Sequence, residues 1–529
     1  MNLSLPFEVL LILHRLQQAG FTAFLVGGAV RDLLIQAVEN RVKSAPVTDF
    51  DFTTNAKPEE IQQVFPDSFY ENKFGTVSIT HKNLWEMLQK QHFQLPAQNL
   101  TDLYQTWYKN QRRRRIIDPK KASKIHQSLV VSAENQVELP TPKPFEITTY
   151  RADGTYDDHR RPDSVSWGKT IEDDLQRRDF TINALAISVK QSVLENFFDQ
   201  RVFPPFIKLS QDQYQLIDPY QGMKDLAAKQ IRTVGNPDLR FKEDALRLLR
   251  AIRFAAQLSM TITPTTLRAV KQHAVSIQHV SWERIQDEFF KILTSPLPKR
   301  GIELMESTGL LEHILPELLE GKGVEQGGHH NTDVWTHALD ALASCPSPNP
   351  VVRLATLLHD VGKPRTKQIT DGKITFYNHE IIGSRIASKI AQRFKLSRKN
   401  TDRIFTLVRY HMFYYQPHNT DASIRRFMRK VELKNIDDIL DLREADRLGS
   451  GAKKTSWRLE EMKTRMVEQL NQPLEVSDLA INGHDLIEEL GFKPGKQIGQ
   501  ILHQLFAQVL EQPELNTKAV LLKKAKELT

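Results

Sequence analysis

The hydrophobic pattern of the chain changes from strand-like to helical near residue 220. Before that point, short apolar stretches such as 48–54, 74–79 and 145–151 have the alternation or composition of strands. Beyond it, apolar residues recur with helical spacing, as in 242–258. We therefore expect an α+β chain, with an α/β N-terminal part followed by an all-helical part.

Composition excludes several classes of protein. The length of 529 residues suffices for three or four domains, and the net charge of +8 favours a polyanionic partner without establishing one. Cys345 is the one cysteine, which excludes an intramolecular disulfide and a zinc site of several thiolates. No apolar run approaches the ~18 residues that a membrane span needs, and no basic region of a secretory signal precedes the first apolar run. We expect a cytoplasmic protein with no membrane contact.

Two aspartates on one predicted strand are the most prominent candidate site residues. Asp49 and Asp51 lie two positions apart, so a strand would direct both carboxylates to one face. Two like charges this close favour a bound cation, and paired carboxylates that hold Mg²⁺ suit phosphoryl transfer. Gly27 and Gly28 open a predicted helix, where backbone N–H groups would face a phosphate. Taken singly, these features also fit solvated acids and an ordinary turn, and Glu146 is either a third catalytic carboxylate or a surface glutamate.

Several motifs, taken together, resemble those of one enzyme family. They are LVGGAVRDLL (25–34), TDFDFTT (48–54), RRPDSV (160–165), IEDDLQRRDFTINALA (171–186), IDPYQGMKDL (217–226) and RTVGNPDLRFKEDALRLLRAIRFAA (232–256). Through them the chain resembles the class II CCA-adding tRNA nucleotidyltransferases and their bacterial poly(A) polymerase relatives. The resemblance implies a polymerase-beta-like nucleotidyltransferase head followed by helical neck, body and tail. It also implies Mg²⁺-dependent addition of C, C and A, from CTP and ATP, to tRNA 3′ ends without a nucleic-acid template.

Other activities remain open at this point. A poly(A) polymerase, or an enzyme that adds only CC or only A, would use the same fold. A metal phosphohydrolase whose head merely binds RNA would require inert head carboxylates. A protein that only binds RNA would leave two complete clusters of acids and histidines without a purpose.

The resemblance assigns nucleotide-binding roles to the later motifs. Arg178 and Asp179 match the family's ribose-recognising pair, and Asp244 and Arg247 match its amino-acid template for the incoming base. Cytosine and adenine both offer an exocyclic amine to a carboxylate and a ring acceptor to an arginine, whereas uracil does not. The alternatives are a structural Arg–Asp pair at a helix start and an i,i+3 salt bridge worth only about 0.2–0.5 kcal/mol. The remaining predicted nucleotide-binding residues are Arg31 and Arg250.

Motifs in the helical half predict a metal centre. NTDVWTHALDAL (331–342), LLHDVGK (357–363) and EADRLGSG (444–451) match the pattern of HD phosphohydrolases, and CCA-adding enzymes often carry such a domain after the head. The predicted ligands are His337, His359, Asp360 and Asp446. They would bind a divalent metal of unspecified identity with a position open for a nucleophilic water. His379 and His411 are candidates for a second metal, but a lone histidine is more often a core or surface residue, and His411 is interpreted so.

These assignments divide the chain into four segments. They are a head (1–190), a helical neck and body that reads the base and binds RNA (191–320), an HD domain (321–455) and a tRNA-binding helical tail (456–529). Residues 81–144 form an insertion too long for a hairpin loop. Its Arg112–Arg115 cluster either contacts RNA or belongs to a solvated, partly disordered segment. In the tail, Lys493 and Lys496 are the predicted RNA contacts, with a helical packing unit as the alternative. No protein partner is implied.

Overall fold

The computed structural model describes residues 1–39, 47–70, 75–90, 95–96, 98–111, 141–152, 166–199, 203–327, 332–370 and 372–528. The RRPDSV motif and the Arg112–Arg115 cluster lie outside these ranges. The described residues form two compact units: the first holds those up to 111, those from 141 to 289 and 303–313, and the second holds 290–302 and those from 314 onward. The finer division into four segments stays a prediction.

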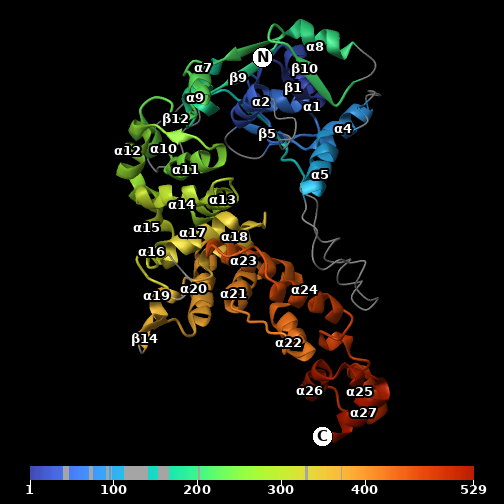
Figure 1. Ribbon diagram of the computed structural model, residues 1–529. Coiled ribbons are helices and arrows are strands. Elements are labelled where there is room, and N and C mark those ends of the chain that lie inside the picture. Colours follow the sequence, from blue (N-terminus) through green and yellow to red (C-terminus); the bar gives the residue numbers. More distant parts are fainter. Residues whose placement is uncertain are drawn as a thin grey trace. The chain divides into compact units, whose positions relative to one another are not determined.

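A seven-stranded mixed sheet forms the N-terminal part of the first unit (Figure 1). Its strand order is β11-β9-β2-β3-β6-β5-β4, and among these strands only β3 and β6 pair in parallel. The strands are β2 (Ala23–Val26), β3 (Asp51–Thr54), β4 (Phe69–Tyr70), β5 (Thr76–Ile79), β6 (Phe145–Thr149), β9 (Ala186–Val189) and β11 (Tyr214–Ile217). The predicted strands around residues 51, 76 and 145 are confirmed, and so is the α+β class.

Short two-stranded sheets and helices complete the first unit. The short pairs are β1 (Leu3–Pro6) with β10 (Phe206–Leu209), β7 (Arg151–Ala152) with β8 (Ser166–Trp167), and β12 (Gln230–Ile231) with β13 (Thr261–Ile262). The helices up to the end of the sheet are α1 (Phe7–Gln18), α2 (Gly28–Glu39), α3 (Pro58–Val64), α4 (His81–Lys90), α5 (Leu100–Gln111), α7 (Ile171–Gln176), α8 (Gln191–Phe198) and α9 (Gly222–Ala227). Those that follow are α10 (Pro237–Glu243), α11 (Leu246–Leu258), α12 (Pro264–His273) and α15 (Leu310–Ile314), while α13 (Trp282–Leu293) and α14 (Pro298–Ser307) each have residues in both units.

The core of the head combines strand residues with an almost fully buried helix. Helix α1 buries every residue from Phe7 to Leu13, because apolar side chains occupy nearly all of these positions. They join the apolar residues of β2, β3, β5 and β6 in one cluster. This packing holds the ends of β3 and β6, where the predicted acids lie, on a rigid support.

The N-terminal half of the predicted insertion is part of this fold. Buried Glu8 on α1 accepts hydrogen bonds from Trp85 Nε1 on α4 (3.2 Å) and from the Leu100 N–H at the start of α5 (3.0 Å). Burial raises the pKa of Glu8 above its ordinary value, while these two donors act in the opposite direction. Helices α4 and α5 are therefore attached to the head by a buried polar contact, so this half of the insertion is not a solvated appendage.

The second unit is almost entirely helical, as predicted. Its helices are α16 (Pro316–Leu319), α17 (Val334–Ser344), α18 (Pro350–Leu358), α19 (Lys363–Thr366), α20 (His379–Arg393), α21 (Arg398–Tyr410), α22 (Asp421–Val431), α23 (Ile436–Gly449), α24 (Trp457–Gln469), α25 (Gly483–Leu490), α26 (Lys496–Glu511) and α27 (Lys518–Glu527). One hairpin, β14 (Gln368–Thr370) with β15 (Lys373–Thr375), interrupts them. Residues 479–525 contribute a separate hydrophobic cluster. Among the described residues, no helix is long and apolar enough to cross a membrane.

Candidate functional site

Three carboxylates come together at the beginning of β3. Asp51 is the first residue of β3, and its partner in the parallel register with β6 is Glu146. Paired residues on neighbouring strands project to the same face of a sheet. Asp49 precedes the strand by two residues, and burial together with the Asp49 carboxylate raises the pKa of Asp51 to about 7. The predicted acids thus form a cluster with an excess of negative charge, which favours a bound cation.

The turn between β2 and α2 approaches this cluster closely. Gly27 has φ +75°, and a Cβ placed on it would lie 2.6 Å from Arg178 Nη1 and 3.7 Å from Asp51 Oδ2. Glycine alone combines this backbone conformation with this clearance. The Gly27 N–H donates to the Leu185 carbonyl (3.2 Å) and so is not free for a phosphate. Gly27 instead makes room for Arg178 beside the acids, while the role of Gly28 at the start of α2 stays a prediction.

Replacement of Gly27 by alanine is expected to impair both stability and catalysis. A left-handed alanine costs about 1–2 kcal/mol, and the new Cβ must also displace the Arg178 guanidinium. Thermal unfolding measures the first effect, and single-turnover nucleotide addition, the activity that the resemblance implies, measures the second. Gly20→Ala is the matched control, because Gly20 has φ +87° but nothing within 4 Å of its Cβ position. We expect similar losses of stability and a loss of rate only for Gly27→Ala; equal rates would contradict the placement of Arg178.

Arg178 and Asp179 are not paired with each other. Arg178 Nη2 donates to Asp174 Oδ2 on α7 at 3.0 Å. Asp179 accepts from Arg250 Nε (2.7 Å) and from Asn183 Nδ2 (3.0 Å). Burial acts in the opposite direction, but Arg250 and Asn183 together hold the pKa of Asp179 well below its usual range. Both carboxylate oxygens of Asp179 are engaged inside the head, which favours a structural role for it over direct contact with a ribose.

Arg31 belongs to the same buried network. Its Nη1 donates to Asn183 Oδ1 (2.5 Å), and its guanidinium carbon lies 5.0 Å from the centroid of the Phe254 ring. Because Asn183 also donates to Asp179, a chain of contacts links α2 through Asn183 and Asp179 to Arg250 on α11. The buried Arg31 is therefore placed to position α2, and the predicted direct contact with a nucleotide does not fit its burial.

The predicted base-reading pair has a different geometry from the one expected. Helix α10 ends before Asp244, whose backbone is extended (φ −147°, ψ 104°), and α11 begins two residues later. Asp244 and Arg247 therefore do not share one helical face, and the salt bridge expected as the alternative is wrong. Asp244 Oδ2 accepts from Arg284 Nη2 (2.7 Å). Arg247 donates to Glu243 and to the Arg177 carbonyl (2.8 Å).

In the second unit, one aspartate joins two groups of histidines. Asp360 Oδ2 lies 3.5 Å from His337 Nε2 and 3.2 Å from His359 Nε2. Asp360 Oδ1 lies 3.5 Å from His379 Nε2 and 3.6 Å from His411 Nε2. All five side chains are buried, and each group of three has the spacing of a metal-ligand set. The fold places His411, interpreted from the sequence as an ordinary core or surface histidine, in the buried group opposite Asp360.

Three of the four histidines have the orientation that a metal ligand requires. Nδ1 of His359, His379 and His411 lies 2.8, 2.8 and 2.7 Å from the carbonyl oxygens of Thr356, Phe376 and Val408. A proton on Nδ1 satisfies each carbonyl and leaves the Nε2 lone pair directed at the cluster. This tautomer is the one in which a neutral imidazole binds a metal through Nε2.

Asp446 and Lys363 complete this cluster. Asp446 Oδ1, on α23, lies 3.2 Å from His337 Nε2, so all four predicted ligands converge. Lys363 Nζ donates to Asp360 Oδ2 at 2.6 Å. Burial opposes ionisation, but His359 and Lys363 hold the pKa of Asp360 well below its ordinary value. Lys363 therefore compensates the charge of the bridging carboxylate and is not free to neutralise a phosphate.

Three family models match parts of this chain. The poly(A) polymerase head domain matches residues 23–115 and 105–202, which include the acid cluster. A model described as the probable RNA- and SrmB-binding site of polymerase A matches residues 259–321, and tRNA nucleotidyltransferase domain 2 matches 380–525.

Curated relatives decide the family. The chain is 35% identical over 359 residues to the A-adding tRNA nucleotidyltransferase of Deinococcus radiodurans, covering 65% of this chain and 76% of the relative. The chain belongs to the tRNA nucleotidyltransferase family. It is also 28% identical over 532 residues to the CCA-adding enzyme of Ligilactobacillus salivarius, covering 98% and 96% of the two chains. The crystal structure of the Bacillus stearothermophilus CCA-adding enzyme with CTP is similar at 25% identity and a TM-score of 0.61, covering 98% and 96%.

Four residues of the cluster around Asp360 lie outside the stretches that the family models match, whereas His411 and Asp446 lie within the match at 380–525. His337, His359, Asp360 and His379 all lie between the matched stretches that end at 321 and begin at 380. The argument for this cluster therefore depends on its geometry. Among the residues that sequence reasoning missed, Asn183 lies inside the quoted RRDFTINALA motif, whereas Arg284 carries no local signal.

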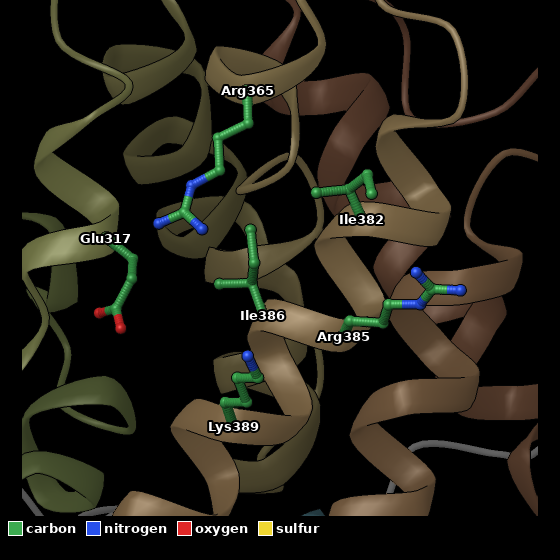
Figure 2. Close-up of a pocket in the computed structure, with 6 residues that line it drawn as sticks. All are labelled: Glu317, Arg365, Ile382, Arg385, Ile386 and Lys389. Atoms are coloured by element: carbon green, nitrogen blue, oxygen red, sulfur yellow. The ribbon is translucent and has the colours of Figure 1, made fainter.

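A pocket of about 210 Å³ lies beside α20 in the second unit (Figure 2). Its lining residues are Glu317, Arg365, Ile382, Arg385, Ile386 and Lys389. Arg365 binds the Glu320 carboxylate at 2.6 and 2.8 Å, and Glu317 binds Arg393 at 2.8 Å. None of the lining residues belongs to the metal cluster, so we assign neither predicted reaction to this pocket.

Proposed function

We propose that this tRNA nucleotidyltransferase completes tRNA 3′ ends by adding C, C and A from CTP and ATP. The observation that carries the proposal is the cluster of Asp49, Asp51 and Glu146, with Arg178 beside it. Likeness along nearly the whole length to a CCA-adding enzyme supports the order of additions. The tRNA 3′-hydroxyl attacks the α-phosphate of the nucleotide, and pyrophosphate leaves.

The acid cluster fits a divalent cation. Burial raises the pKa of Asp51 to about 7, which means that its negative charge lacks sufficient compensation. The Lys143 ammonium lies 2.7 Å from Asp49 Oδ2, so a positive charge is already bound to one of these acids. Asp49 and Asp51 would hold Mg²⁺, with Glu146 adjacent. Mg²⁺ bound there would activate the attacking hydroxyl and stabilise charge on the phosphate.

Cationic side chains beside the acids would bind the nucleotide. Arg178 is fixed by Asp174 and lies next to Gly27, which suits it to the triphosphate. The buried Asp179 and the partly exposed Arg250 support this region through their hydrogen bond, so they act by positioning. In this version of the site, Arg178 contacts the nucleotide directly, and Asp179 holds α11 in place.

Asp244 and Arg247 remain the proposed readers of the incoming base, in a geometry that includes Arg284. Arg284 holds Oδ2 of Asp244 and the Leu246 N–H holds its Oδ1, while Glu243 and the Arg177 carbonyl hold the Arg247 guanidinium. These partners already order both side chains, so that binding a base costs less side-chain conformational entropy. A carboxylate acceptor and a guanidinium donor, held independently, suit the amine and ring nitrogen that cytosine and adenine share.

Replacement of Asp244 by alanine is expected to relax discrimination against UTP by about 10- to 100-fold, since one base-reading pair contributes about 1–3 kcal/mol. Arg284→Ala is expected to act in the same direction more weakly, because it only loosens Asp244. The ratio of kcat/KM for CTP and UTP measures the effect. Glu283→Ala, an exposed acid beside Arg284, is the control and should leave the ratio unchanged. An unchanged ratio in Asp244→Ala would remove Asp244 from base selection.

The second candidate is addition of A alone, which the Deinococcus radiodurans relative favours by name. Two tRNA transcripts separate the candidates. Both enzymes extend a transcript that ends in CC, but only a CCA-adding enzyme extends one that lacks all three nucleotides when CTP and ATP are present. Extension of the CC transcript alone would assign this chain to the A-adding group.

A second activity is proposed for the second unit. Two ligand groups that share Asp360 suit two divalent metals, and Asp446 adds a carboxylate to the first group. Metals bound there would supply a nucleophilic hydroxide and stabilise charge on a phosphoester. We therefore assign a metal-dependent phosphohydrolase reaction to this cluster, with residues 321–455 as its domain.

The tail is proposed to contact tRNA. Lys493 and Lys496 are exposed, and Lys496 is the first residue of α26. Lysines at this position would bind backbone phosphate without regard to base sequence. With the single cysteine, these roles also support the predicted cytoplasmic location.

A further inference from the structure

A lysine from the predicted insertion reaches the acid cluster. Lys143 stands two residues before β6 begins, and its Nζ donates to Asp49 Oδ2 at 2.7 Å. About two-thirds of the Lys143 side chain and over half of the Asp49 side chain are exposed (65% and 56%), so the pair is accessible to solvent and ions. The Lys143 ammonium, an accessible cation, therefore already binds Asp49, which is one of the two carboxylates assigned to Mg²⁺.

The backbone of Lys143 is fixed by the opposite end of the insertion. His81, the first residue of α4, lies with Nε2 3.1 Å from the Lys143 carbonyl oxygen, and its ring is 4.2 Å from the Phe145 ring. Burial lowers the pKa of His81 to about 4, so the ring is neutral near pH 7 and donates Nε2–H to this carbonyl. The two ends of the insertion thus meet at this point and hold Lys143 beside Asp49.

The charges around Asp49 make the Lys143 ammonium a competitor of a bound metal ion. Asp49, Asp51 and Glu146 face the cations Lys143 and Arg178. Arg178 is also bound to Asp174, whereas Lys143 is directed at Asp49 itself. A divalent cation that binds Asp49 must displace the ammonium and then remain near its charge.

We propose that the Lys143 ammonium competes with the divalent cation for the Asp49 carboxylate. This competition sets the metal concentration at which the head becomes active. This inference rests on the proposed metal site at Asp49 and Asp51. Because the competitor is tethered, its effective concentration is fixed by the fold and does not depend on the surrounding solution. Because the pair is exposed, added salt weakens the competition.

The test measures Mn²⁺ binding to the full chain by electron paramagnetic resonance. All variants carry Asp360→Asn, so that the second cluster does not contribute bound Mn²⁺. Lys143→Met is expected to tighten Mn²⁺ binding roughly three- to tenfold. Lys143→Arg keeps the charge and should bind like the parent. Lys82→Met is the matched control, since Lys82 is exposed and adjoins His81 but pairs only loosely with Glu86 at 3.6 Å.

Each outcome decides one question. Tighter binding in Lys143→Met alone, with a difference that shrinks as salt rises, supports the competition. Unchanged or weaker binding in Lys143→Met, while Asp51→Asn abolishes it, overturns the inference and leaves the metal site intact. Mn²⁺ binding that Asp51→Asn does not reduce overturns the proposed metal site, and the competition with it.

Discussion

Replacement of Asp51 by asparagine is expected to reduce nucleotide addition by at least about a thousandfold. Asp51 is more enclosed than the exposed Asp49, and burial and Asp49 already raise its pKa to about 7. An amide in its place cannot supply the negative charge that a divalent cation requires. Single-turnover addition of the first nucleotide to tRNA measures the effect directly.

Two comparisons make the Asp51 result specific. Glu59→Gln removes an exposed acid from α3 of the same unit and should leave the rate unchanged. Asp51→Asn should also retain the metal content of the second cluster and any hydrolysis there. Full activity of Asp51→Asn would contradict the assignment of the head as the site of polymerisation.

Replacement of Asp360 by asparagine is expected to remove both metals proposed for the second cluster and the proposed phosphohydrolase activity. Asp360 presents one oxygen to each histidine group, so the change affects both groups at once. An amide keeps the shape of the side chain but loses its charge and one acceptor. Metal analysis after dialysis should fall from about two ions per chain in this cluster to about none.

The histidines distinguish a two-metal centre from a one-metal centre. His411→Ala should remove about one ion and leave the other. His418→Ala, an exposed histidine of the same unit, should remove none. Thermal unfolding of each variant separates loss of metal from loss of fold. Equal metal content in Asp360→Asn and the parent would contradict the proposed centre.

Local patterns in the sequence were sufficient for the fold class and for the first set of acids. Alternation in 48–54 and 145–151 predicted strands, and β3 and β6 indeed lie in one sheet. The spacing of Asp49 and Asp51 then fixed their common face, because side-chain direction alternates along an extended chain. The His359-Asp360 dyad was equally informative, since both groups lie in one short motif.

Interactions between distant segments could not be predicted in this way. Helical periodicity continues through KEDALR, yet the chain leaves the helix at Asp244, whose carboxylate accepts from the Leu246 N–H (3.1 Å) and from Arg284 Nη2 (2.7 Å), 40 residues later. His411 was a weak candidate in the sequence, and its place beside Asp360 follows only from the packing of α21 against α20. Lys143 lies in a segment that reads as a linker, and the contact with Asp49 depends on how β6 enters the sheet.

The central claim is tested most directly by the products formed on a tRNA transcript that lacks its three terminal nucleotides. The purified chain is supplied with Mg²⁺ and with CTP, ATP or both, and products are resolved at single-nucleotide resolution. The account predicts two additions with CTP alone, and three additions followed by a stop with both nucleotides. Long A tails, or no extension with CTP, would contradict it.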